Sequence, residues 1–353
     1  MTRPERHHRE VWNNARHSHA FGFTLIETLL VIVVLAVLIV LLTSSIGGVR
    51  RASRASVCLS NLRQFGVASS AYAFDFDDRI FGFTWRKGYT GSLYRDLRNL
   101  TSDNSAAAAQ AIEILRLRGG RRDLPASLIR GWIPHVQYTH LVIQDYLTQR
   151  LPEMMAACPG DVDLLDWQKQ PQENFDQGKW LPRQPDPIDE GNKRWPYGSS
   201  YQIVPASYDN GVRGSRIHQQ GMLHHQYLVP ASASLGDRRL AEVRFPGGKV
   251  FMQESEDRLR SRSRLYYANS NAVVSVLMFD GSAGARKTVN ADLGWDPNRP
   301  NSRQPTQMVY RPRAWEAPIE PGLTEVLYAG YYRWTREGLA GADFGASASL
   351  PRP

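Results

Sequence analysis

The sequence predicts an α+β fold in which one long N-terminal α-helix packs on a C-terminal antiparallel β-sheet. Residues 23–78 contain no proline and read as a single helix. Short runs rich in β-branched and aromatic residues, separated by turn residues, follow from residue 200 onward and are typical of strands. With 353 residues, 22% charged residues and a formal net charge of +9, the chain is neither a polytopic membrane protein, a collagen-like fibre nor a disordered chain.

The N-terminal half of this helix is strongly apolar. Leu29–Leu42 is a run of fourteen residues without a polar side chain, and extension back to Phe23 gives 20 residues. A helix of about 20 apolar residues can cross a bilayer. The preceding residues 1–22 carry four arginines against two glutamates. This pattern predicts a basic leader, a transmembrane span at about 23–43, a cytoplasmic N-terminus and a periplasmic domain. The alternatives are a buried helix of a soluble protein, a cleaved signal peptide and a plain signal anchor.

A short motif joins the leader to the apolar stretch. The residues read Gly22-Phe23-Thr24-Leu25-Ile26-Glu27. This string resembles the type IV prepilin signal, which pilins share with the pseudopilins of type II secretion. The resemblance implies that a prepilin peptidase cuts between Gly22 and Phe23 and that Phe23 becomes the N-methylated first residue. Glu27 would pair with the new amine of a neighbouring subunit during assembly, because a buried unpaired charge is costly.

The helix continues as an amphipathic stripe. Apolar residues recur every three or four positions from Leu59 to Tyr72. The segment Cys58–Gln64, with Asp75 following, resembles a subfamily of prepilin-like proteins of uncharacterised function. Cys58 and Cys158 are the chain's two cysteines, too few for a disulfide framework or an all-cysteine zinc site. In the predicted topology they could form a disulfide that staples the helix to the globular region, or remain two separate buried thiols.

The domain organisation follows from these features: a leader at 1–22, a helix at 23–75, and an extracytoplasmic α+β domain at 76–353 with a loop-rich insertion at about 167–196. Asp280-Gly281 favours a hairpin turn between two strands. It resembles the subfamily's C-terminal signature, a histidine, nine residues and then Asp-Gly, but Ser270 stands at the histidine position. The other expected elements are helices at 105–118 and 135–151 and strands at 200–204, 227–229, 250–253, 272–279 and 286–289.

No nucleotide-binding, hydrolase or metalloprotease motif occurs, so the sequence predicts no enzyme activity, no cofactor and no metal. Three groups were weighed as ligand candidates. Histidines 218, 224 and 225 could bind a metal, although neighbouring histidines on a strand face opposite ways. Two aspartate groups could bind calcium, but solvated acidic turns are favoured. The arginine run at 258–264 could contact nucleic acid, but a solvated surface is favoured, and no nucleic-acid partner is expected. The aspartates are Asp75, Asp77, Asp78, Asp161, Asp163 and Asp166.

The resemblance implies a pseudopilin-like structural subunit of a type II secretion or type IV pilus-like system in the inner membrane. Its partners would be the prepilin peptidase, which also methylates the new N-terminus, other pseudopilins, the inner-membrane secretion platform and the lipid bilayer. The alternative function is a membrane-anchored periplasmic binding or enzyme domain that uses the signal only as an anchor.

Overall fold

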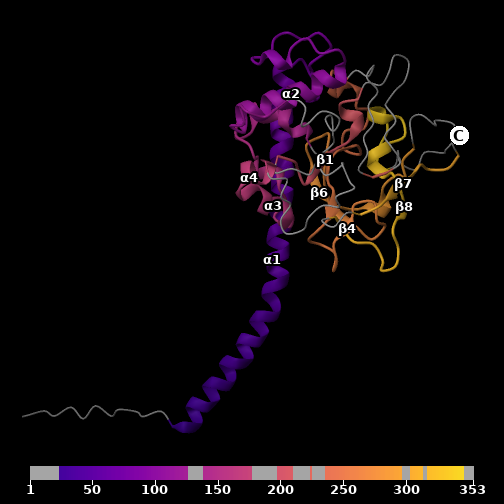
Figure 1. The fold of residues 1–353 in the computed structure, drawn as a ribbon. Helices are drawn as coiled ribbons and strands as arrows, with labels where there is room; N and C mark the ends of the chain where they lie inside the picture. The colour runs from indigo at the N-terminus through magenta and orange to yellow at the C-terminus, as the bar shows by residue number, and fades with distance from the viewer. Residues whose placement is uncertain are drawn as a thin grey trace, which may run out of the picture. The chain divides into compact units, whose positions relative to one another are not determined.

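The computed structural model describes residues 24–125, 138–176, 197–209, 223–224, 235–295, 303–312 and 316–345 (Figure 1). Within these ranges the chain is α+β. Four α-helices precede the strands: α1 (Leu25–Asp75), α2 (Asp103–Arg118), α3 (Val162–Lys169) and α4 (Pro171–Asp176). The strands are β1 (Tyr201–Ile203), β2 (Val250–Glu254), β3 (Glu256–Asp257), β4 (Leu265–Tyr266), β5 (Val273–Met278), β6 (Ala283–Lys287), β7 (Gln307–Tyr310) and β8 (Val326–Ala329).

Helix α1 has 51 residues and no internal break. Among the residues that the structure describes, however, no helix is both long enough and apolar enough to cross a membrane. The transmembrane span predicted at about 23–43 is therefore wrong, and so is the single-pass inner-membrane placement that rests on it, because a span needs about 20 predominantly apolar residues in one helix.

Contacts divide the chain into two compact units, residues 1–50 and residues 51–353. The boundary falls inside α1, so only its C-terminal part, from Arg51 onward, belongs to the same unit as the sheet. The fold predicted from the sequence, a transmembrane spine helix packed on the sheet, is corrected accordingly. The α+β domain and the helix are present, but the apolar part of α1 is a separate unit and the structure shows no spine.

The second unit is built around a four-stranded antiparallel sheet with strand order β1-β2-β5-β6. The hairpin β5–β6 pairs Val273 with Lys287 at its open end and Leu277 with Ala283 next to the turn. Two smaller hairpins, β3–β4 and β7–β8, are also antiparallel. Successive side chains on a strand point to opposite faces of the sheet, so neighbouring residues of one strand belong to different sides.

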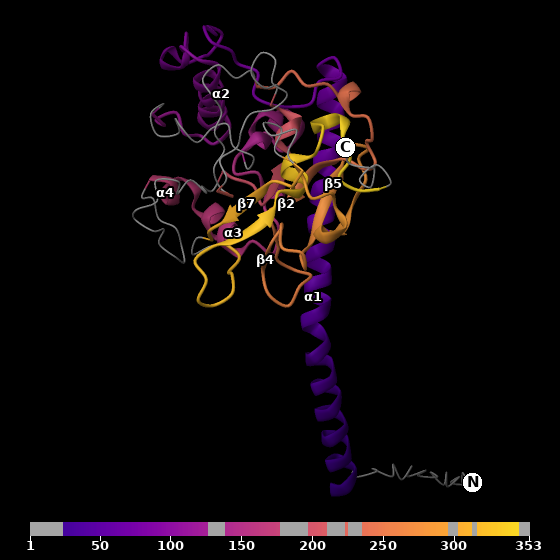
Figure 2. The same cartoon turned by 90° about the vertical axis from the view of Figure 1, so that its right-hand side faces the viewer.

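Each face of the sheet contributes to a different apolar core. Leu62 and Phe65 of α1 are fully buried in one cluster together with Phe251 and Leu277 of the sheet. Val274 and Val276 are buried in the other cluster, with residues of β7 and of the C-terminal segment, including Met308, Tyr310 and Trp334. Figure 2 shows the strands β2, β5 and β7 in the globular part of the chain. The residues after Arg51 in α1 thus cover one face of the sheet.

Several local predictions differ from the structure. Helix α2 is present, and the Ser102 side chain accepts a hydrogen bond from the Ser105 N–H at its N-terminus. The helix expected at 135–151 is instead a 3-10 helix at Thr139–Tyr146, preceded by residues outside the described part. The insertion expected at about 167–196 includes the end of α3 and the whole of α4, which its prolines had obscured; its residues 177–196 and the strand expected at 227–229 are not described.

Candidate functional site

The first turn of α1 contains the described part of the prepilin-like motif. Gly22 and Phe23 lie outside the described residues, whereas Thr24 and Glu27 form a reciprocal cap. Glu27 Oε2 accepts hydrogen bonds from the Thr24 N–H at 2.8 Å and the Thr24 hydroxyl at 2.9 Å, while the Glu27 N–H donates to Thr24 Oγ1 at 3.3 Å. This is the capping box of a helix N-terminus. The backbone hydrogen bond from Thr24, followed by that from its hydroxyl, lowers the pKa of Glu27.

An apolar surface follows this cap. The large apolar side chains between Leu25 and Leu41 are exposed on all sides of α1 within its own unit, with exposed fractions from 48% at Leu38 to 83% at Leu25. An uninterrupted exposed apolar surface of this kind marks an interaction site. The apolar stretch is evident from the sequence. The cap was not predicted, although the spacing Thr-x-x-Glu before an apolar run is its sequence signal.

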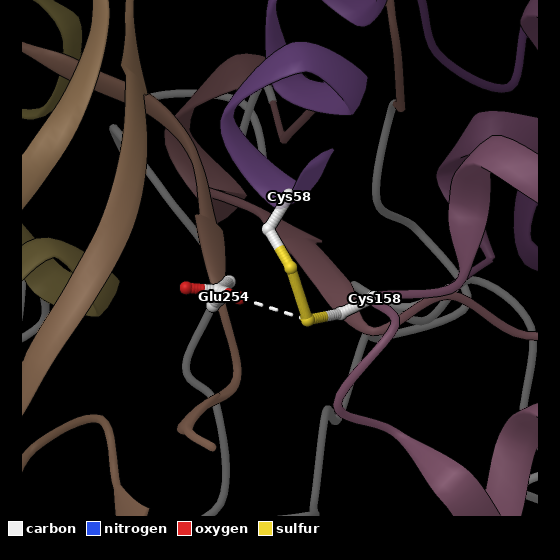
Figure 3. Close-up of side chains that lie close together, drawn as sticks. All are labelled: Cys58, Cys158 and Glu254. Carbon is white, nitrogen blue, oxygen red and sulfur yellow. Dashed lines mark hydrogen bonds between the residues drawn. A yellow bond between two sulfur atoms is a disulfide. The ribbon is translucent and has the colours of Figure 1, made fainter. Parts of the chain in front are cut away.

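A second site joins α1 to the globular unit. The structure links Cys58 of α1 and Cys158, which precedes α3, by a disulfide with a Cα–Cα distance of 5.3 Å (Figure 3). Both residues are fully buried. The bridge spans 100 residues of sequence, so it ties the helix to a segment that lies far away along the chain.

Asn61 lies one turn after Cys58, on the same face of α1, and strengthens this attachment. Its side-chain amide donates to the Ala157 carbonyl and to the Tyr201 hydroxyl, each at 3.3 Å. Tyr201 in turn donates its hydroxyl to the Cys58 carbonyl at 3.4 Å. Burial is the main cause that raises the pKa of Tyr201 far above its ordinary value, so the phenol stays a hydrogen-bond donor. The Cys-x-x-Asn spacing therefore places two anchoring side chains on the sheet side of α1.

Glu254, at the end of β2, faces the disulfide. One carboxylate oxygen, Oε2, accepts from the Ser275 N–H at 2.8 Å and from Arg260 Nη1 at 3.2 Å. The other oxygen, Oε1, lies 3.2 Å from Cys158 Sγ (Figure 3). Burial raises the pKa of this fully enclosed carboxyl, and the Arg260 charge opposes that shift. The role of Glu254 could not be predicted from the sequence, because nothing in its local pattern connects it to the cysteines 96 and 196 positions away.

Apart from the exposed Arg262, the arginine run beside this site is neither the solvated surface that the sequence suggested nor a free basic patch. Arg258 is buried and pairs with Asp161 at 3.0 Å and with Glu256 at 3.5 Å. Arg264 also forms an ion pair with Glu256, in which its Nε lies 2.7 Å from Glu256 Oε2. The physical reason is that the acidic strand residues at 254–257 fold back onto the arginines that follow them, so charges of opposite sign neutralise one another. The acidic residues at 254–257, directly before the arginines in the sequence, are the signal from which this pairing could have been predicted.

The six aspartates weighed as calcium ligands all have other partners. Asp161 caps α3 through the Leu164 N–H, Asp163 lies 3.5 Å from Arg264, and Asp166 pairs with Lys169 at 2.7 Å. In the other group, the partners are the Tyr146 hydroxyl for Asp75, Arg239 for Asp77 and the Ala241 N–H for Asp78.

The histidine candidates are not brought together within the described chain. His224 Nε2 lies 2.9 Å from Glu316 Oε2, and its Nδ1 accepts from the Arg311 N–H; His218 and His225 lie outside the described residues. Within the described ranges, Cys58, Cys158 and Glu254 form the group whose ligand atoms are close enough to hold a metal ion, all within 4.8 Å of one another.

The signature turn lies between β5 and β6. Gly281 has a φ of +82°, a conformation that glycine adopts without strain, and its N–H donates to the Met278 carbonyl at 3.0 Å. Helix α1 passes close to this hairpin at Gly66, where a Cβ would meet Leu277 Cδ1 at 3.2 Å. Ser270, which stands where the signature that the sequence resembles has a histidine, is exposed in the turn between β4 and β5. The turn therefore lies against the helix.

Comparisons with known proteins add no family assignment. The chain matches no protein-family model, no curated protein and no solved structure. The comparisons thus give no support to the pilin and secretion terms that the sequence motif suggested, and the motif itself carries the resemblance.

Proposed function

We propose that this chain is a pseudopilin-like structural subunit of a type II secretion or type IV pilus-like system. In this proposal a prepilin peptidase cuts after Gly22, methylates the amine of Phe23, and releases a subunit that assembles with its own copies and related subunits. The observation that supports it is the opening of α1, where the prepilin-like string ends in a capped first turn and leads directly into apolar side chains exposed on all sides. Such a helix gains free energy by packing against similar helices.

Glu27 has two roles to separate in this proposal. It caps its own helix through Thr24, and after cleavage it would also pair with the Phe23 amine of a neighbouring subunit. A carboxylate that accepts only two bonds through Oε2 retains Oε1 for such a cation. Because both roles use the same side chain, a single Glu27 variant does not distinguish them.

The first experiment tests processing. The full chain is expressed with and without a prepilin peptidase, and the N-terminus of the product is determined by mass spectrometry. We expect N-methyl-Phe23 as the first residue with the peptidase and an intact Met1 without it. Gly22→Val should block cleavage, because a branched side chain prevents the extended backbone from entering a narrow active site. A wild-type chain that keeps Met1 beside an active peptidase contradicts the proposal.

The second experiment tests assembly with a matched pair of variants. Glu27→Gln removes the charge, whereas Thr24→Ala removes the hydroxyl of the cap and keeps the Glu27 carboxylate. Pairing between subunits predicts that Glu27→Gln stops incorporation into fibres and that Thr24→Ala assembles nearly normally. Equal loss of assembly in the two variants would show that Glu27 acts only as a helix cap.

A further inference from the structure

The group formed by Cys58, Cys158 and Glu254 has a feature that a disulfide alone does not explain. In the part of the chain that the structure describes, the polar contact of Glu254 Oε1 is Cys158 Sγ at 3.2 Å. A disulfide sulfur carries no hydrogen and cannot donate to a carboxylate. The oxygen is buried, and it is aimed at sulfur instead of at the arginine that holds its twin Oε2. This arrangement suits a carboxylate that binds the same metal ion as the sulfur atoms.

We propose that the reduced form of this site binds a divalent metal ion of the zinc class through Cys58, Cys158 and Glu254, with water as the fourth ligand. The three ligand atoms lie within 4.8 Å of one another. In a tetrahedral zinc site, bond lengths of about 2.3 Å to sulfur and about 2.1 Å to oxygen place a sulfur and an oxygen about 3.6 Å apart. The distance of 3.2 Å between Cys158 Sγ and Glu254 Oε1 is close to this value.

The surroundings of Glu254 are those of a metal ligand that is held in place. Arg260 Nη1 and the Ser275 N–H fix Oε2, and this leaves Oε1 directed at the sulfurs. Hydrogen bonds of this kind orient a ligand and adjust its affinity for the metal. Two thiolates and one carboxylate carry three negative charges, which a divalent ion and the neighbouring Arg260 balance. Soft thiolates favour zinc-class ions over magnesium or calcium.

Metal binding and the disulfide exclude each other, because both use the same sulfur atoms. Reduction by a phosphine consumes one water molecule, breaks the S–S bond, gives two thiols and leaves the phosphine oxide. The thiols then lose their protons as the ion binds. The site would therefore have two forms, a disulfide under oxidising conditions and a metal site under reducing conditions. This inference is independent of whether the chain assembles into fibres.

Cobalt(II) is the probe for the test, with the full chain reduced by a phosphine and kept without oxygen. We expect a near-ultraviolet thiolate-to-cobalt band and the visible absorption of tetrahedral cobalt, both saturating at one ion per chain and lost on addition of zinc. X-ray absorption of the zinc form should show two sulfur and two oxygen neighbours. Absence of the thiolate band, or a zinc environment without sulfur, would overturn the proposal.

Variants test each part of the site. Arg260→Gln removes the side chain that orients Glu254 and should weaken cobalt binding about 10–100-fold. Glu254→Gln should weaken cobalt binding at least as much. Cys158→Ser removes one of the two thiolates, so the thiolate band should lose the intensity that is characteristic of two sulfur ligands. Glu153→Gln is the control, because Glu153 is equally buried but bonds only to Thr148 and neighbouring backbone in another segment. Equal cobalt affinity in Glu254→Gln and Glu153→Gln would exclude the Glu254 carboxylate as a ligand. If a variant does not fold, the X-ray absorption of the wild type with zinc shows whether sulfur and oxygen bind the ion.

Discussion

Glu27 should make the start of α1 sensitive to pH. Its pKa is lowered in the folded chain by hydrogen bonds from Thr24, so the cap is fully formed above the unfolded pKa of about 4.3 and is lost as the pH falls through the lower folded value. We expect amide hydrogen exchange at Glu27 and Thr28 to accelerate as the pH is lowered, once the exchange rates are corrected for their intrinsic dependence on pH. Glu27→Gln should remove this dependence. An exchange profile unchanged by the substitution would contradict the cap.

Arg258 illustrates a residue whose charge is needed inside the protein. Its side chain is only 1% exposed beside Asp161 and Glu256. Burial, the largest single influence, lowers the pKa of Arg258, but the two carboxylates outweigh it and raise this pKa above its ordinary value. Arg258→Met would remove the positive charge that pairs with these two buried carboxylates, Asp161 and Glu256. We expect the free energy of unfolding to fall by about 3–5 kcal/mol. Urea titration measures the change.

The control for Arg258 lies four positions further on. Arg262 belongs to the same run but is exposed, so Arg262→Gln should change the free energy of unfolding by no more than about 0.5 kcal/mol. Similar effects of the two substitutions would mean that the run acts through its overall charge and not through the buried pairs.

At the scale of elements, α1 should behave differently on its two faces. Leu62 is fully buried against the sheet, whereas Val67 is 72% exposed. Leu62→Ala removes buried methyl groups and leaves a cavity, so we expect a loss of about 2–5 kcal/mol in the free energy of unfolding. Val67→Ala should be within about 0.5 kcal/mol of the wild type. Thermal or urea unfolding of the two variants compares the faces directly, and equal losses would contradict the packing of α1 on the sheet.

The sequence could predict those elements whose signals are local. The three-to-four-residue spacing that contains Leu62 predicts α1, and Asp280-Gly281 predicts the β5–β6 turn, because each depends on neighbours along the chain. The site around Cys158 could not be predicted in full. Glu254 and Arg258 become important only through partners brought close by folding, and a pattern of isolated arginines looks the same whether it is solvated or buried. The transmembrane prediction failed for a related reason, since apolar composition alone does not define a span.

At the scale of the whole molecule, the Cys58–Cys158 link determines how firmly the C-terminal part of α1 is attached. The segment that it encloses contains α2 and the 3-10 helix at Thr139–Tyr146. Asn61 and Tyr201 reinforce the same junction with hydrogen bonds, so the helix would keep part of its attachment without the disulfide. Reduction should therefore weaken the fold without changing which surfaces are packed.

The disulfide should stabilise the unit of residues 51–353 by restricting its unfolded chain. A bridge with a sequence separation of 100 residues closes a long loop, and such bridges typically contribute about 2–4 kcal/mol. We expect the double variant Cys58→Ser/Cys158→Ser to lose about this much free energy of unfolding, and we expect added reductant to lower the stability of the wild type but not of the variant. A chelator in every sample prevents a metal ion from replacing the bridge. A wild type whose unfolding is the same with and without reductant would show that the link contributes nothing, and the attachment of α1 would then rest on Asn61, Tyr201 and the apolar core alone.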